Sequence, residues 1–138
     1  MNFIEAVKTE PVILAEGAVI ERLNRDDRIQ LDPHIVNSGL IYDSHGREAL
    51  NAIYRQYIDI GLCHGLPMIT LAPTWRANPE RIQKSEFKHK NHINSDCVSF
   101  LNEIRRSYGT YACDIYVGGL MACAGDAYQP DEALSLAH

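Results

Sequence analysis

Two short segments of this sequence place polar side chains directly after apolar runs, where they could bind a small molecule. Glu16-Gly17 follows Val12-Ile13-Leu14-Ala15, and Thr74-Trp75-Arg76 follows the run at residues 66–73. A carboxylate at the end of a strand can hold an amino group or accept a proton. A tryptophan beside hydroxyl and guanidinium donors suits a small ligand that has both apolar and polar parts.

Each of these residues also has a purely structural interpretation. Glu16 could be a solvated acid before a flexible turn, and Trp75 could close one end of a barrel beside a solvated Arg76. After a third apolar run, Gly118-Gly119 could approach a ligand or form a tight turn. Asp126, in the loop that follows, could bond to its own backbone. Residue types alone leave these alternatives open.

The histidines and cysteines of the sequence form no recognisable metal or catalytic motif. His89 and His92 are flanked by lysines in a turn-like segment. No C-x-x-C pair occurs among the four cysteines, which are Cys63, Cys97, Cys113 and Cys123. The sequence also lacks a G-x-S-x-G nucleophile elbow, a G-x-G-x-x-G turn and a P-loop. We therefore assign no catalytic residue and no metal ligand from the sequence.

The elements that must position these residues alternate along the chain. Hydrophobic patterning and helix start signals predict strands at 12–15, 66–73 and 113–119, helices at 47–62, from 79 and at 95–108, and the start of another helix at 131. Ser44 or Asp43 could cap the first of these helices, and Asn94 or Ser95 the third. A polar connection at about 21–45 is long enough to be either functional or disordered.

Strands that alternate with helices predict an α/β fold with parallel pairing. Ligands of such folds bind at the carboxyl ends of the strands, where Glu16-Gly17 and Thr74-Trp75 fall. A closed (β/α)8 barrel needs about 250 residues, and this chain holds about three βα units. We predict a single domain over residues 1–138, made of parallel βα units of a TIM barrel that is incomplete. A small open sheet is the alternative.

Composition and charge exclude several classes of protein. The chain has 138 residues, 13 Lys and Arg against 18 Asp and Glu, and a formal charge of −5, a balance that disfavours nucleic-acid binding. No apolar run reaches the roughly 18 residues of a membrane span. Residues 1–8 lack the basic segment of a signal peptide. We expect a cytoplasmic protein that binds neither nucleic acid nor membrane.

The order of the segments resembles that of the homocysteine S-methyltransferase family. Residues 12–18, followed by Glu21-Arg22-Leu23, are similar to the opening strand and first loop of that family, where an apolar run leads into an Asp-Gly-Ala-type turn. Residues 53–61, 69–78, 118–128 and 132–135 are similar to later parts of the pattern. The resemblance covers essentially the whole chain in collinear order.

The resemblance implies a (β/α)8 barrel that transfers a methyl group from a donor such as S-methylmethionine or betaine to the thiol of homocysteine, giving methionine. At the matching positions, Glu16 and Gly17 would contact the amino-acid part of homocysteine, and Thr74 and Trp75 would line the same pocket. Three cysteines, two of them adjacent, hold a zinc ion in the family. None of the cysteines here stands at a matching position, so zinc is expected for the complete family enzyme and not from residues of this chain.

Two departures from the family pattern bear on the partners we expect. Glu16 stands where the family usually has Asp, which lengthens the reach of the carboxylate by one methylene. A three-strand parallel piece also leaves edges uncovered. Beside homocysteine and a methyl donor, we therefore expect a homo-oligomer or a complementing barrel half, with this chain a truncated or partial form. The alternatives are a non-catalytic half-barrel that binds a small amino acid or scaffolds an oligomer, and a stand-alone small α/β domain.

Overall fold

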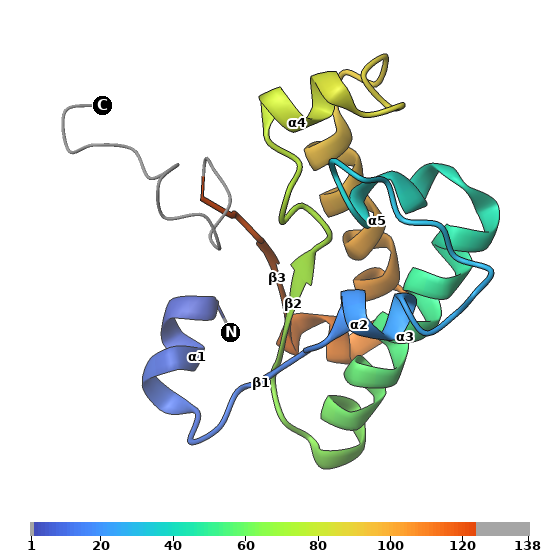
Figure 1. Ribbon diagram of the computed structural model, residues 1–138. Helices are drawn as coiled ribbons and strands as arrows, with labels where there is room; N and C mark the ends of the chain where they lie inside the picture. Colours follow the sequence, from blue (N-terminus) through green and yellow to red (C-terminus); the bar gives the residue numbers. More distant parts are fainter. Residues whose placement is uncertain (1, 124–138) are drawn as a thin grey trace, which may run out of the picture.

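The computed structural model describes residues 2–123, and a three-stranded parallel sheet organises them (Figure 1). The strands are β1 (Leu14–Ala15), β2 (Met68–Ala72) and β3 (Ile115–Gly119), in the order β1-β2-β3. Both pairs are parallel, and Leu14, Met68 and Ile115 lie in register across the sheet. The predicted α/β class with parallel pairing is confirmed, and within residues 2–123 the sheet is open.

Helices alternate with these strands and form the layers around the sheet. They are α1 (Phe3–Thr9), α2 (Val19–Leu23), α3 (Ser44–His64), α4 (Pro79–Lys84) and α5 (Ile93–Arg106), with 3-10 turns η1 (Ser38–Tyr42) and η2 (Gly109–Asp114). The two long helices α3 and α5 lie on one side of the sheet, and α1 lies on the other side (Figure 1).

The longest helix, α3, follows directly from local signals in the sequence. The Asp43 carboxylate accepts a hydrogen bond from the Gly46 backbone N–H at 2.6 Å, which confirms one of the two predicted caps. Its buried side chains, Leu50, Ile53, Tyr54 and Ile58, recur at helical spacing and face the core. The helix ends at Gly65, whose φ of +62° is the left-handed conformation that favours glycine.

The predicted cap of α5 was wrong. The helix begins at Ile93, after His92, and neither Asn94 nor Ser95 is outside it. Ile93 is buried, so its burial draws the first turn two residues earlier than predicted. The Asn94 amide instead donates to the Ala77 carbonyl at 2.9 Å, which joins α5 to the loop after β2.

The strands are buried on one face more fully than on the other, although a continuous apolar run is typical of a strand buried on both faces. In β2, Met68, Thr70 and Ala72 are buried, whereas Ile69 and Leu71 are half-buried. Tyr116 is in register with Ile69, and its ring lies 5.3 Å from that of Phe3. Residues in register share a face of the sheet. The short helix α1 therefore covers part of the face that α3 and α5 leave open.

The helix α1 was not predicted, although the sequence carries a capping signal for it. The Asn2 side chain accepts from the Glu5 N–H, and the Glu5 carboxylate accepts from the Asn2 N–H, which is a capping box.

The long connection at 21–45 is ordered and contributes to the core. It contains η1 and part of α2, and its buried apolar residues are Leu23, Ile35, Leu40 and Ile41. The length of the segment had suggested disorder as one of two options, but four apolar residues spaced along it are enough to anchor it.

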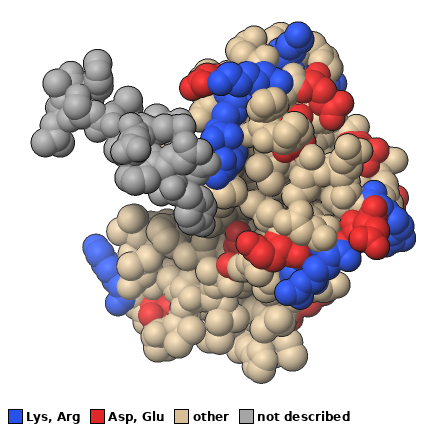
Figure 2. All heavy atoms as spheres, viewed as in Figure 1, with Lys and Arg blue, Asp and Glu red and all other residues tan. Residues whose placement is uncertain are grey.

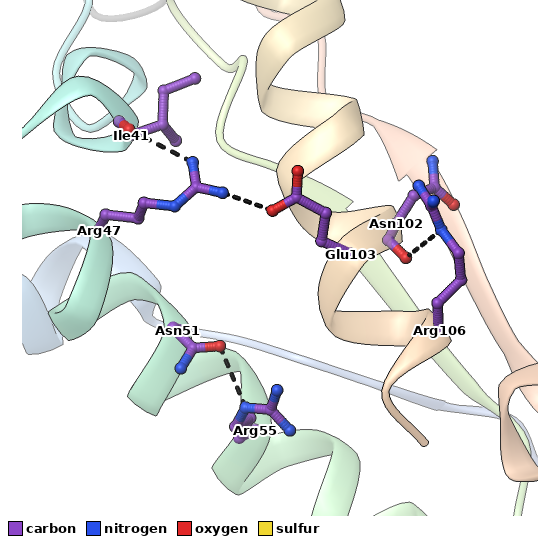
Figure 3. Close-up of polar contacts among 7 residues, drawn as sticks. All are labelled: Ile41, Arg47, Asn51, Arg55, Asn102, Glu103 and Arg106. Atoms are coloured by element: carbon purple, nitrogen blue, oxygen red, sulfur yellow. Dashed lines mark hydrogen bonds and ion pairs between the residues drawn. The ribbon is translucent and has the colours of Figure 1, made fainter. Parts of the chain in front are cut away.

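Polar contacts from one arginine join α3, η1 and α5 (Figure 3). Arg47 of α3 forms an ion pair with Glu103 of α5, and it donates to the Ile41 carbonyl at 3.4 Å. The Arg47 guanidinium also lies 4.7 Å from the ring centroid of Phe100. Exposed ion pairs contribute little to stability, so these contacts orient the two helices rather than hold them together.

Some predictions concern residues outside the described part. The loop around Asp126 and the helix start at residue 131 lie outside residues 2–123. Within the described part, no helix is both long and apolar enough to cross a membrane.

Candidate functional site

A pocket of about 210 Å³ lies beyond the carboxyl ends of β1 and β2. Three of the four residues predicted to bind substrate line it, namely Glu16, Gly17 and Trp75. Other lining residues include Asn37 from the long connection and Tyr54 from α3. The volume is below the roughly 300–1,000 Å³ of sites for drug-sized ligands, so the pocket suits a smaller molecule.

Among the described residues, Glu16 is one of the two carboxylates that line this pocket. Its Oε1 accepts a hydrogen bond from the Leu71 backbone N–H at 2.9 Å, and its buried Oε2 has no hydrogen-bond partner among residues 2–123. Burial raises the pKa of Glu16 above its ordinary value of 4.5, and the bond from Leu71 opposes that shift. The carboxylate is therefore held in position, but its charge is only partly compensated.

Tyr54 is linked to the Glu16 carboxylate through Leu71 of β2. Its hydroxyl donates to the Leu71 carbonyl at 2.9 Å, while the Leu71 N–H is bonded to Glu16. Burial, and then the charge of Glu16, raise the pKa of Tyr54 far above the range in which it ionises. Tyr54 is thus a neutral donor that fixes Leu71. The sequence placed it only in the apolar stripe of α3.

The backbone after β1 turns sharply around the pocket. Ala18 has a φ of +53°, an uncommon conformation for a residue other than glycine, and it begins α2. The Tyr57 hydroxyl donates to the Gly17 carbonyl, which joins this turn to α3. A Cβ at Gly17 would meet no atom within 4 Å, so packing does not require glycine there.

Asn37 lines the pocket and was not among the predicted site residues. Its side chain is almost fully buried, with 4% of its surface exposed, and its Oδ1 has no partner within the described part of the chain. The only signal in the sequence was its position in the polar Asn37-Ser38-Gly39 segment, which suggested a turn.

Thr74 contacts the edge of the site rather than this pocket. Its Oγ1 donates to the Leu120 carbonyl at 2.8 Å and accepts from the Leu120 N–H at 3.1 Å. These bonds join the loop after β2 to the loop after β3. They hold Leu120 as a wall that this pocket shares with a neighbouring pocket of about 410 Å³. Thr74 lines the neighbouring pocket.

Trp75 lies between the two pockets and lines both. The Arg76 guanidinium lies 4.5 Å from the centroid of the Trp75 ring, a cation–π arrangement. Arg76 therefore stacks on the indole instead of being simply solvated, one of the alternatives left open above.

The charge of the smaller pocket distinguishes it from an anion site. Within the described part of the chain, its lining residues include Glu16 and Glu21 and no Lys, Arg or His. Figure 2 shows Asp and Glu atoms beside the hollow in the middle of this face, whereas many Lys and Arg atoms lie towards α4. The pocket is unsuited to phosphate and favours a positively charged group.

The zinc ion implied by the family resemblance has no ligand set in the described residues. Among residues 2–123, no three His, Cys, Asp or Glu side chains lie close enough together to hold a metal ion. Cys97 is buried in the core, with its Sγ 3.7 Å from the Ser38 carbonyl oxygen, whereas the other three cysteines are exposed. Burial raises the pKa of the Cys97 thiol to about 12, which keeps it protonated. The described residues do not fit a zinc centre.

Comparison with known proteins identifies no relative of this chain. No family model, curated protein or solved structure matches it.

The position of Glu16 makes a specific prediction about stability. Because burial raises its pKa, the folded state binds a proton more tightly than the unfolded chain does. The part of the free energy of unfolding that depends on this proton is fully present below pH 4.5. It is lost as the pH rises through the raised pKa of Glu16. Glu16→Gln removes this loss. We therefore expect the Tm of the variant to fall less than that of the unmodified chain between pH 4 and pH 7.5.

Thermal unfolding of both proteins at the two pH values measures this difference. Glu86→Gln is the matched control, because Glu86 is exposed and lies outside the pocket lining. If the difference in Tm between Glu16→Gln and the unmodified chain is the same at both pH values, the charge of Glu16 is compensated in the folded state and the prediction is wrong.

Proposed function

We propose that the pocket beyond β1 and β2 binds the amino-acid end of homocysteine, and that the chain forms part of a (β/α)8 barrel of the homocysteine S-methyltransferase kind. The observation that carries this proposal is Glu16, a partly buried carboxylate in a pocket with no basic side chain among the described residues. Such a charge costs free energy unless a positive group approaches it. The α-ammonium group of an amino acid is such a group.

The rest of the pocket suits the other end of the same molecule. Ala72, Pro73, Trp75 and Leu120 give it an apolar wall, against which methylene groups and a sulfur atom can pack. Nucleotides and sugar phosphates fit less well, because their charge has the wrong sign. The pocket also lies where parallel α/β proteins bind ligands, at the carboxyl ends of strands.

The role we propose for the described residues is to bind and orient homocysteine. Holding the substrate in one orientation contributes to catalysis when a methyl donor is bound in line with its sulfur. A zinc ion, when bound, lowers the pKa of a thiol so that the thiolate exists at neutral pH. We assign no residue to that step, since the described residues offer no zinc centre.

Calorimetric titration with L-homocysteine under reducing conditions, and with its product L-methionine, tests the proposal. We expect both to bind the unmodified chain and Glu86→Gln equally, and to bind Glu16→Gln at least tenfold more weakly. The loss is expected because a neutral amide replaces one partner of a charge-assisted hydrogen bond. Equal binding by Glu16→Gln would contradict the proposal.

A second measurement separates the enzyme from the non-catalytic alternative. Methionine formed from homocysteine and S-methylmethionine, measured by mass spectrometry with added zinc, would support methyl transfer by this chain. Binding that depends on Glu16 without methionine formation would support the half-barrel that only binds an amino acid.

A further inference from the structure

The Asn37 side chain is a buried polar group that has no evident structural role in the fold. Its Oδ1 has no hydrogen-bond partner within residues 2–123, and only 4% of the residue is exposed. Buried polar atoms are almost always hydrogen-bonded, because an unmade bond costs free energy. Asn37 lines the pocket that also contains Glu16. An unpartnered amide oxygen in the wall of a pocket is a group that a donor from a ligand would stabilise.

The usual structural role of asparagine at this position is absent. Asn37 precedes η1, where an asparagine side chain normally accepts a hydrogen bond from the backbone of the first turn. In this protein the Asn37 side chain forms no such bond. Its amide is therefore not occupied in stabilising the turn.

The backbone before Asn37 is held in a fixed and uncommon conformation. Val36 has a φ of +54°, which β-branched residues rarely adopt. Two backbone bonds between Asp32 and Val36 close the turn, at 2.9 and 3.1 Å. The Asp32 carboxylate accepts from the N–H groups of His34 and Ile35, at 2.7 and 2.9 Å.

The backbone after Asn37 is held as well. The Ser38 hydroxyl donates to the Pro73 carbonyl at 2.5 Å, which attaches this segment to the end of β2. The backbone at Asn37 is thus held on both sides, which keeps this residue in the wall of the pocket. A site residue that is held in this way loses little entropy when a ligand binds.

We propose that Asn37 is a specificity-determining residue which, together with Glu16, selects a primary ammonium group. This inference rests on the proposed function of the pocket. Glu16 supplies the negative charge and one acceptor, and Asn37 Oδ1 supplies a second acceptor from a different segment of the chain. A primary ammonium group has three N–H donors, whereas a dimethylated ammonium group has one and a trimethylated group has none. Two separate acceptors therefore favour the primary form.

Titration of three probes tests this selection. The probes are L-methionine, N,N-dimethyl-L-methionine and 3-(methylthio)propylamine, which has the primary amine but no carboxylate. Asn37→Leu replaces the amide by an apolar group of similar size, which is close to neutral for stability where a buried amide has no partner. Asn37→Ala is the second variant, and a measured Tm confirms that each variant is folded. Asn91→Ala is the matched control at an exposed position outside the pocket lining.

We expect the unmodified chain and Asn91→Ala to bind L-methionine at least tenfold more tightly than its dimethylated form. Both Asn37 variants should bind L-methionine about tenfold more weakly and dimethyl-methionine nearly unchanged, because the lost contact is made only by the second N–H.

Each outcome bears on the two proposals differently. Unchanged discrimination in both Asn37 variants would overturn the role of Asn37 and leave the Glu16-dependent binding of amino acids in place. Binding of 3-(methylthio)propylamine that depends on Asn37, without binding of L-methionine, would support the role of Asn37 and overturn the amino-acid part of the proposed function. A chain that binds none of the probes would overturn both.

Discussion

Tyr54→Ala is expected to destabilise the chain by about 3–5 kcal/mol, the range found when a large buried aromatic side chain is removed. Only 1% of Tyr54 is exposed, and its ring packs at 6.3 Å from that of Phe100. The substitution also leaves the Leu71 carbonyl without its side-chain donor. Urea unfolding followed by circular dichroism measures the effect as a lower midpoint with a similar slope.

Tyr54→Phe is the control that separates packing from hydrogen bonding. It keeps the ring and removes only the hydroxyl that donates to Leu71, so we expect a loss of about 1 kcal/mol. Similar losses in both variants would show that the hydrogen bond, rather than the packing of the ring, carries the stability. A loss below 1 kcal/mol in Tyr54→Ala would contradict the placement of Tyr54 in the core.

Gly61→Ala is expected to destabilise the chain by about 1–3 kcal/mol, although alanine forms helix better than glycine does. A Cβ at Gly61 would clash with the Tyr111 Oη and would lie 3.2 Å from the Leu66 carbonyl oxygen. Tyr111 is buried, and its hydroxyl donates to the same carbonyl at 2.6 Å. The ring must move and lose this bond, which outweighs the gain in helix propensity. Thermal and urea unfolding measure the net effect.

The clash can be tested by removing the atom that causes it. Adding Tyr111→Phe to Gly61→Ala deletes the hydroxyl that the new methyl group would meet, so the double variant should be more stable than the sum of the two single changes predicts. Gly119→Ala is the matched control, because a Cβ there would meet no atom within 4 Å. Additive effects in the double variant would contradict the close contact between Gly61 and Tyr111.

The sequence was most informative where a local signal and a buried face coincide. The Asp43 cap, the apolar stripe of α3 and the final Gly65 all lie within one continuous segment, so they could be predicted from spacing. The strands at residues 66–73 and 113–119 were found as apolar runs, but the first was predicted too long at both ends and the second was predicted to begin two residues too early. Strand ends depend on which backbone groups find partners in the neighbouring strand, and spacing carries no information about those partners.

The candidate site was predicted in part, for the same reason. Glu16 and Trp75 each follow an apolar run, and the rule that ligands bind at the carboxyl ends of parallel strands placed them together. Asn37 and Tyr54 come from a polar connection and from the apolar side of a helix, where nothing local marks them as site residues. They reach the pocket only because α3 packs against the sheet and η1 packs against α3 and α5.

By itself, the sequence determined the order of the three strands and of α3, α4 and α5, the parallel class of the sheet and the residues that follow each strand. These depend on hydrophobic periodicity and on caps, which act over a few neighbouring residues. Tertiary structure alone decided that Leu71 joins Glu16 to Tyr54, that the Asn37 amide is buried without a partner, and that Thr74 contacts Leu120 and not the pocket beside Glu16. Each of these depends on contacts between residues at least 17 positions apart in the chain or on burial by such residues, and no local pattern encodes them.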